Sequence, residues 1–446
     1  MNANANVQAY HRQMVAPTGV SHALSLRLTT HQQEGVISQL ITARDSFIQI
    51  WNIIELGETA TLQHIYSRRL HGTISSLSRV RTLASKHDGA DRVLVSFLDA
   101  KMALMEWTPA VHELLPISLH TFEKLPQVVD GLARTATDPG SRISVLLLPS
   151  NTGGDGILAV LPFFQEELDL ESLGVDADAW GADGIPSLPY APSHLLPLAS
   201  LTASQSTFAG PSRSSTLSNA PLANSNAPPV RNVIDMVFLP GFNEPTLALL
   251  YAPEPTWTGR LENVSNNCLV SLVTLATSSS SSSATTSKEG SSTTAVVIAT
   301  SPPLPHSALS IHPCPPDLGG TLIITANGIL HLEQGGKVIG CATNGWFSRE
   351  WFGNGANAPG ASLKEELEGS RVVFISNTKA MIFAKSGTVL ELTLEVSGRS
   401  VSSMKLSKCG MGVAASCVER IRGSRGRFGE KGLVFVGSEV GESTLI

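Results

Sequence analysis

Short apolar segments of strand length, separated by turn residues, restrict the fold of this chain more than any other feature of its sequence. In the stretch 93–107, Val93, Val95 and Phe97 share one face of an extended segment. A second apolar segment follows directly, and Asp99-Ala100 stands between the two, where a tight turn is needed. This spacing predicts an antiparallel hairpin and indicates an all-β chain.

Three more hairpins are predicted further along the chain. One is centred on Asn327-Gly328, a dipeptide that tolerates the two positive φ angles of a type I′ turn. The predicted strand pairs are 321–326 with 329–332, 371–376 with 380–385, and 389–396 with 401–406. Neighbouring hairpins predict meander sheets, and meander sheets arranged radially form a propeller. A β-sandwich is the competing interpretation.

Polar, low-complexity sequence interrupts this pattern in three stretches, 165–230, 278–292 and 353–370. Such sequence buries too little apolar area to offset the entropy lost on ordering, so we expect disordered surface inserts. The rest of the chain, divided among seven blades, gives about 50 residues per blade, near the size of known propeller repeats. We therefore predict a seven-bladed β-propeller of antiparallel meander sheets over 1–446, without its closing strand or strands.

Charge and hydropathy exclude several classes of protein. Charged residues make up 15% of the chain and the net charge is -6, so the sequence lacks the overall basic character of a protein that wraps nucleic acid. No apolar run reaches the roughly 18–20 residues of a membrane span, and the start of the chain has no signal-peptide core, which predicts an intracellular protein. The five cysteines form no Cys-x-x-Cys pair and are expected to be reduced.

Two clusters of charged residues are candidate binding sites. The first cluster is a basic loop that contains Arg420, Arg422, Arg425, Arg427 and Lys431. This loop could make weak contact with RNA phosphates, but a solvated loop between two strands is the simpler interpretation. The second cluster is an acidic run that contains Glu166, Glu167, Asp169, Glu171, Asp176, Asp178 and Asp183. This run could hold a metal ion or a basic partner, but its residues lack EF-hand spacing, which favours interpretation as a solvated loop.

The remaining candidates favour structural roles. His306, His312 and Cys314 lie close together, but no second ligand pair with zinc spacing accompanies them. Trp257 near Arg260 could form a cation–π pair that faces a partner, or the Trp could anchor a loop.

Sequence motifs of catalysis are absent from the chain. The glycine-rich stretch 153–156 lacks the Gly-Lys-Ser/Thr of a phosphate-binding loop and is typical of a turn. There is no nucleophile elbow, His-Glu-x-x-His pair or dinucleotide fingerprint. We therefore predict a protein that is not an enzyme, with no catalytic residues, no metal and no cofactor.

Several segments together resemble the largest subunit of the cleavage and polyadenylation specificity factor. The most specific are 234–246, which ends in the family's Gly-aromatic-x-Glu-Pro-Thr segment, and 256–260, which reads Thr-Trp-Thr-Gly-Arg. Further similar segments are 91–101 with its Asp-Ala-Lys turn, 118–123 (Ser-Leu-His-Thr-Phe-Glu), 318–322 with Asn327, and 434–443. The last resembles a Gly-Ser-x-x-Gly-Asp/Asn-Ser signature, which the large subunit of the damaged-DNA-binding protein and a spliceosomal propeller subunit share.

Within that last signature the chain departs from the family. Glu439-Val440 stands where family members usually carry Arg-Leu, and Glu442 stands where they carry Asp or Asn. The contact that the usual Arg would make is therefore left open.

The resemblance implies a function in the nucleus. It identifies the chain as the N-terminal propeller region of a longer protein and implies a non-catalytic scaffold of pre-mRNA 3′-end cleavage and polyadenylation. The implied partners are the WD-repeat and zinc-finger subunits that read the polyadenylation signal, in a multi-subunit complex that binds RNA mostly indirectly and contacts no membrane. The alternatives are a related propeller scaffold of the spliceosome or of a ubiquitin-ligase adaptor, and a direct RNA-binding module that uses the 420–431 loop.

Overall fold

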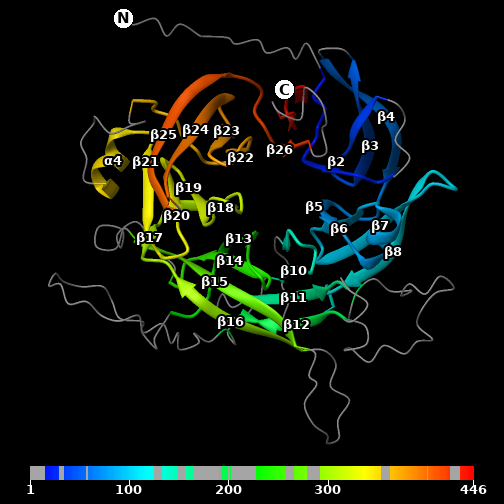
Figure 1. The fold of residues 1–446 in the computed structure, drawn as a ribbon, viewed down its shortest axis with the longest axis horizontal. Coiled ribbons are helices and arrows are strands. Elements are labelled where there is room, and N and C mark those ends of the chain that lie inside the picture. Colours follow the sequence, from blue (N-terminus) through cyan, green and yellow to red (C-terminus); the bar gives the residue numbers. More distant parts are fainter. Residues whose placement is uncertain are drawn as a thin grey trace, which may run out of the picture.

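The described part of the chain forms seven antiparallel sheets arranged in a ring, a seven-bladed β-propeller (Figure 1). The structure is a computed structural model. It describes residues 16–29, 35–56, 59–124, 133–148, 156–164, 190, 192–198, 201, 228–254, 256, 266–278, 292–352, 362–398, 400–421 and 432–446. The predicted fold class is confirmed, and the sandwich alternative is wrong.

Blades 1 to 3 each contain four strands in sequence order. Blade 1 consists of β1 (His22–Leu26), β2 (Val36–Arg44), β3 (Phe47–Leu56) and β4 (Thr59–Arg69). Blade 2 consists of β5 (Ile74–Val80), β6 (Arg92–Phe97), β7 (Lys101–Thr108) and β8 (Glu113–Thr121), with the short helix α1 (Leu83–Asp88) between β5 and β6. Blade 3 consists of β9 (Arg134–Thr137), β10 (Ile143–Leu148), β11 (Ile157–Pro162) and β12 (His194–Pro197).

Blades 4 to 7 repeat this order with additions. Blade 4 consists of β13 (Val233–Leu239), β14 (Thr246–Tyr251), β15 (Asn266–Ser278) and β16 (Ser292–Thr300), and β17 (Leu304–Pro305) also pairs with β15. Blade 5 consists of β18 (Ala308–Pro313), β19 (Thr321–Thr325), β20 (Gly328–Leu332) and β21 (Val338–Ala342), followed by helix α4 (Gly345–Phe352). Blade 6 consists of β22 (Arg371–Phe374), β23 (Lys379–Phe383), β24 (Thr388–Ser397) and β25 (Ser400–Met411). Blade 7 has three described strands, β26 (Cys417–Arg420), β27 (Val434–Gly437) and β28 (Thr444–Leu445).

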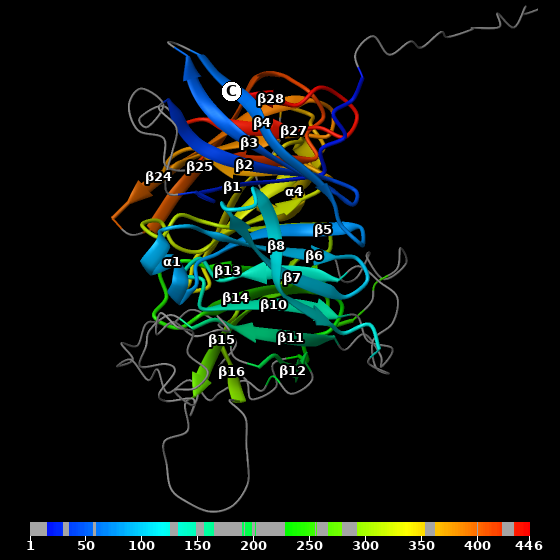
Figure 2. The ribbon, with the colours of Figure 1, turned by 90° about the vertical axis from the view of Figure 1, so that its right-hand side faces the viewer.

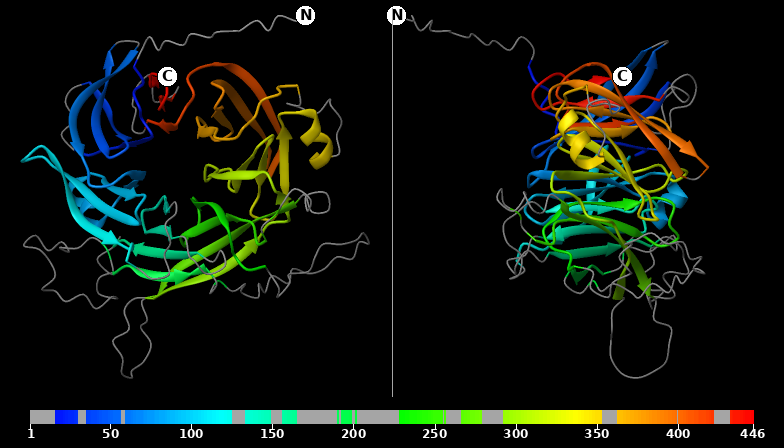
Figure 3. Two further views of the ribbon diagram at one scale, coloured as in Figure 1. Left: turned by 180° about the vertical axis from the view of Figure 1, so that it is seen from behind. Right: turned by 90° about the vertical axis from the view of Figure 1, so that its left-hand side faces the viewer.

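The first strand of each blade is the innermost strand of the ring. These first strands contact one another around the centre (Figures 1 and 3). The contacting pairs are β1 with β5, β5 with β9, β9 with β13, β13 with β18, β22 with β26, and β26 with β1. Seen from the side, the sheets stack along the ring with their faces against one another (Figure 2). Because every blade is an antiparallel meander built in the same order, all innermost strands begin on one face of the ring and end on the other.

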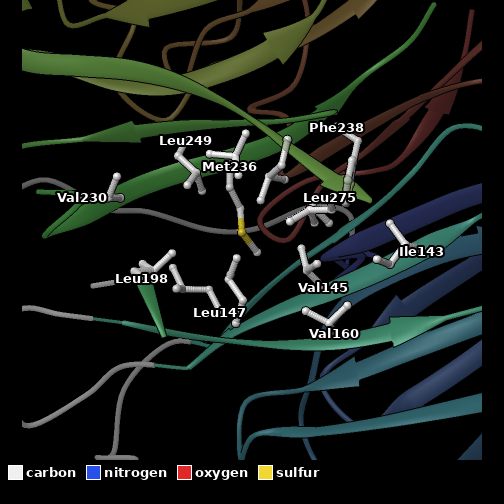
Figure 4. Close-up of a cluster of buried hydrophobic side chains, with 14 of the residues drawn as sticks. Ile143, Val145, Leu147, Val160, Leu198, Val230, Met236, Phe238, Leu249 and Leu275 are labelled. Carbon is white, nitrogen blue, oxygen red and sulfur yellow. The ribbon is translucent and has the colours of Figure 1, made fainter. Parts of the chain in front are cut away.

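Apolar side chains fill each of the seven seams between neighbouring blades. One cluster joins blades 3 and 4, where Val145 and Val160 face Met236 and Leu249 (Figure 4). Equivalent clusters occupy the other seams, including the one between blades 7 and 1, where Phe435 packs with Leu40. Central strands such as β6 and β10 therefore bury both faces, and burial of this apolar area is the main contribution to the stability of the ring.

All four predicted hairpins are present, and two of their turns differ in detail. β6 and β7 pair Phe97 with Lys101 across a three-residue loop, in which Ala100 adopts a left-handed φ of 56°. β19 and β20 pair Thr325 with Gly328, so the loop is Ala326-Asn327. Neither residue of Asn327-Gly328 has a positive φ, and the predicted type I′ turn is wrong. Gly328 instead provides space, because a Cβ there would lie 2.4 Å from Cε1 of Phe347 on α4.

The predicted inserts are partly ordered. Strand β12 lies inside the stretch 165–230 and pairs with β11 through Leu195 and Leu196, so no disordered insert runs through this strand. Leu196 packs against the seam between blades 3 and 4, which explains why a four-residue strand forms within polar sequence. Ser278 and Ser292, the limits of the second stretch, pair at the ends of β15 and β16. Most other residues of the three stretches lie outside the described residues.

Candidate functional site

The ring closes where the segment before β1 meets the turn after β27. We call this contact the ring seam. The Thr18 N–H group donates to the Gly441 carbonyl at 3.1 Å, and the Val20 N–H group donates to the Ser438 carbonyl at 3.1 Å. The Thr18 hydroxyl lies 2.6 Å from the Ser443 hydroxyl and accepts the Ser443 N–H group at 3.2 Å. Main-chain groups and hydroxyl groups thus join residues at opposite ends of the described chain.

The signature at 434–443 supplies one side of the ring seam. The Ser438 hydroxyl donates to the Ala414 carbonyl at 2.8 Å and accepts the Gly441 N–H group at 2.9 Å. Glu439 and Glu442, the two departures from the family, are exposed and take no part in these hydrogen bonds. Ring closure therefore depends on the serines and the glycine, and the charge at position 439 does not determine it.

The segment 240–246 forms the turn between β13 and β14, and the neighbouring blade 3 holds it. Nη1 of Arg142 donates to the carbonyl groups of Phe242, at 3.3 Å, and of Asn243. The buried Asp138 carboxylate fixes this guanidinium through two hydrogen bonds of 2.8 and 2.9 Å, which raise the pKa of Arg142 above its usual value. The most specific segment of the sequence is thus part of a contact between blades.

Asp235 connects three blades near the centre of the ring. Its carboxylate accepts the Ile311 N–H group of β18 at 2.9 Å and the Arg134 guanidinium of β9 at 3.3 Å. It also accepts the N–H group of Met236 at 3.0 Å. Burial raises the pKa of Asp235, and these hydrogen bonds oppose the rise. The carboxylate positions blade 4 between its two neighbours.

The histidines and the cysteine predicted to have structural roles do not form a metal site. His312 lies on β18, with Nε2 3.1 Å from the Ser310 hydroxyl. Burial lowers the pKa of His312 to about 4, and the charge of Arg371 acts in the same direction. Burial raises the pKa of the Cys314 thiol to about 12, so it is not a ready thiolate ligand. Within the described ranges no three His, Cys, Asp or Glu side chains come together in a way that could hold a metal ion.

All five cysteines are free thiols, in agreement with the prediction of reduced cysteines. Four of them, Cys268, Cys314, Cys341 and Cys417, have pKa values raised by burial to about 11 or 12. No helix in the described part of the chain has the length and apolar character that would let it cross a membrane.

Several predicted sites fall wholly or partly outside the described residues. Of the basic loop, Arg420 is described and is exposed at the end of β26, whereas Arg422, Arg425, Arg427 and Lys431 lie outside. The acidic run 166–183 and the pair Trp257 and Arg260 also lie outside. In the glycine-rich stretch only Gly156 is described, and a Cβ there would lie 2.8 Å from Cδ1 of Leu147. Close packing is thus one reason for that glycine.

The residues that join the blades were not predicted from the sequence. Arg134, Arg142 and Thr18 find their partners in other blades, and no local pattern identifies such partners. Asp235 left a signal, because it is the single charged residue in the otherwise apolar strand 233–239. A lone carboxylate in a buried strand needs hydrogen-bond donors from a neighbouring element.

Comparison with known proteins gives relatives that extend along nearly the whole chain. The chain is 26% identical over 472 residues to Protein cft1 of Aspergillus oryzae, a match that covers 98% of this chain and 30% of the relative. It is 26% identical over 480 residues to Protein CFT1 of Coccidioides immitis, a match that covers 98% of this chain and 31% of that relative. It is 25% identical over 403 residues to Cleavage and polyadenylation specificity factor subunit 1 of Arabidopsis thaliana, a match that covers 86% of this chain and 23% of that relative. No protein-family model matches. The chain spans less than a third of the length of these relatives.

Proposed function

Because the chain is related over nearly its whole length to the largest subunit of the cleavage and polyadenylation specificity factor, we propose that it acts in pre-mRNA 3′-end cleavage and polyadenylation as a non-catalytic scaffold. In this proposal the ring is a rigid part of a nuclear multi-subunit complex. It forms the N-terminal propeller region of the longer protein and organises the WD-repeat and zinc-finger subunits that read the polyadenylation signal.

One observation carries the scaffold role: two of the segments that resemble the family, 234–246 and 434–443, lie in contacts between blades. Arg142 holds the 240–246 turn, and Thr18 holds the 437–443 turn. These two segments therefore contribute to the frame of the ring. A frame of this kind places surface loops at fixed positions, which is what a platform for other proteins requires.

Affinity purification tests the proposal. The tagged chain is incubated with nuclear extract, and bound proteins are identified by mass spectrometry. We expect subunits of the cleavage and polyadenylation machinery, including the WD-repeat and zinc-finger subunits. The same chain added in excess should inhibit cleavage of a polyadenylation substrate in that extract, because it sequesters those subunits. Asp235→Ala, which loosens the contact among three blades, is the matched control and should compete less well.

Two results would contradict the scaffold proposal. Recovery of spliceosomal or ubiquitin-ligase components in place of polyadenylation subunits would assign the chain to a related propeller family. Cleavage of RNA by the purified chain alone would contradict the non-catalytic role.

A further inference from the structure

Strand β16 forms the outer edge of blade 4, at the rim of the ring (Figures 1 and 2). Within the described part of the chain its main-chain hydrogen bonds run to β15, and no other described strand or helix contacts it extensively. Alternate residues of an outermost strand direct their N–H and C=O groups away from the sheet. β16 can therefore accept a further strand.

The outermost strands of the other blades carry features that oppose the addition of a strand. Three of them contain charged residues or proline: Arg68 and Arg69 in β4, Pro116 in β8, and Lys405 and Lys408 in β25. β12 and β28 have only four and two residues. The remaining one, β21, is contacted by α4 and by β25. These edges are thus blocked by their own side chains, short, or covered.

β16 has none of these features. Its nine residues, Ser-Thr-Thr-Ala-Val-Val-Ile-Ala-Thr, include no charge and no proline. Ala295 and Val297 pack in the seam between blades 3 and 4. The alternate residues Thr294, Val296 and Ile298 are exposed, the last two by 36% and 42%. A neutral edge rich in exposed β-branched side chains is the type that pairs with another chain.

We propose that β16 pairs antiparallel with β16 of a second copy of this chain, around a two-fold axis. Such pairing brings a strand against its own copy, so a charged strand would meet like charge. β16 brings no charge, and its hydroxyl and β-branched side chains are suited to pair with one another. A charged segment of another protein would instead place its charges against Val296 and Ile298 without partners.

The regular part of β16 is long enough for this pair. From Ser292 to Val297 each residue faces one residue of β15, and Ile298 forms a bulge beyond that stretch. Six residues is a common length for a strand in a globular protein. Thr294 lies at the middle of the stretch, so the two-fold axis brings it against or beside its own copy.

This inference is independent of the proposed scaffold role, because the purified chain alone tests it. Sedimentation velocity of the 446-residue chain is measured over a concentration series. One added strand pair is a small interface, so we expect a reversible dimer with a dissociation constant on the order of 10–100 μM. Its mass is twice the 47.1 kDa of the chain. Hydrogen exchange of the β16 amides should slow as the dimer forms.

A charge at Thr294 tests the strand pair directly. Thr294→Lys and Thr294→Glu each bring like charges together in the dimer and should raise the dissociation constant by about 10-fold or more. Mixed in equal amounts, the two variants should associate with one another, because Lys then faces Glu. The matched controls are Thr61→Lys and Thr61→Glu, at an exposed threonine of β4. They should change the dissociation constant by less than about 2-fold.

Three results would overturn the proposal. The native chain stays monomeric throughout the series, the Thr294 variants dimerise as well as the native chain does, or exchange at β16 does not slow in the dimer. The last two would assign the dimer contact to another surface. Equal thermal unfolding midpoints of all variants exclude misfolding as the cause. If the native chain is monomeric and exchange at β16 slows only with subunits recovered from the extract, the edge binds a strand of another protein instead.

Discussion

Substitution of Asp235 separates the effect of its hydrogen bonds from the effect of its charge. Asp235→Ala removes the acceptor of the Ile311 N–H group, and Ile311 is only 3% exposed. A buried N–H group without an acceptor costs about 1–3 kcal/mol. Loss of the ion pair with the partly exposed Arg134 adds up to ~1 kcal/mol. We therefore expect the free energy of unfolding to fall by about 1–4 kcal/mol.

Asp235→Asn keeps the shape of the side chain and an oxygen that accepts the Ile311 N–H group. Burial raises the pKa of Asp235, which means that the surroundings disfavour its charged form. Asparagine lacks this charge, but its amide nitrogen replaces Oδ1, the oxygen that accepts the Met236 N–H group and the Arg134 guanidinium. We therefore expect Asp235→Asn to lower the free energy of unfolding, but by less than Asp235→Ala does, because the acceptor of the Ile311 N–H group is kept.

Thermal unfolding followed by circular dichroism at pH 7.5 provides the measurement. A loss of about 1–4 kcal/mol lowers the midpoint by roughly 1–5 °C in a chain of this size. Asp317→Ala is the control, because this exposed carboxylate also joins two blades, through Asn377 at 2.6 Å, but stands in water. It should lower the midpoint by less than about 1 °C. Equal destabilisation by Asp235→Asn and Asp235→Ala would refute the reasoning, since the charge would then be the larger contribution.

Three further predictions concern packing, pH and ring closure. Gly328→Ala should destabilise the chain by about 1–3 kcal/mol, because its Cβ would overlap the Phe347 ring; chemical denaturation measures this. The low pKa of His312, about 4, means that the folded state resists protonation, so stability is complete above pH 6.5 and falls as the pH decreases towards 4. The destabilisation caused by His312→Asn should therefore shrink by about 2 kcal/mol between pH 7.5 and 5. Thr18→Val removes the hydroxyl of the ring seam and should lower stability by about 1 kcal/mol and increase hydrogen exchange at Ser443.

Each of these predictions has its own control. Gly335→Ala adds a Cβ with no atom within 4 Å and should be neutral; equal destabilisation by both glycine variants would contradict the packing argument. For the pH series, parallel curves for the native chain and His312→Asn would mean that His312 does not titrate as described. For the ring seam, Thr444→Val changes a nearby exposed residue, and exchange that rises equally in both variants would remove the role of Thr18.

Local patterns in the sequence predicted the sheets well. Alternation in the stretch 93–107 predicted the pairing of β6 with β7, because the side-chain period of a strand is visible in a few residues. The local pattern gave a wrong turn type at Asn327-Gly328, because the requirement for glycine at position 328 comes from Phe347 on α4. It failed again at β12, where burial against blade 4 stabilises a strand within polar sequence.

Contacts between blades could not be predicted, because their partners lie far apart in the sequence. Arg134 and Asp235 are separated by 101 positions, and Asp235 and Ile311 by 76. The type of each residue indicated a polar partner, but nothing in the chain specified which blade would supply it. The contact between β1 and β26 has the same origin, since Ser25 and Glu419 become neighbours only when the ring closes.

The ring seam also determines how this propeller can be joined to other proteins. The hydroxyl groups of Thr18 and Ser443 are 2.6 Å apart although 425 positions separate them. Both ends of the described ring therefore emerge at a single point. A unit with adjacent ends can be inserted as a whole into a loop of another domain, or circularly permuted at one of its hairpin turns, without altering the path of its blades.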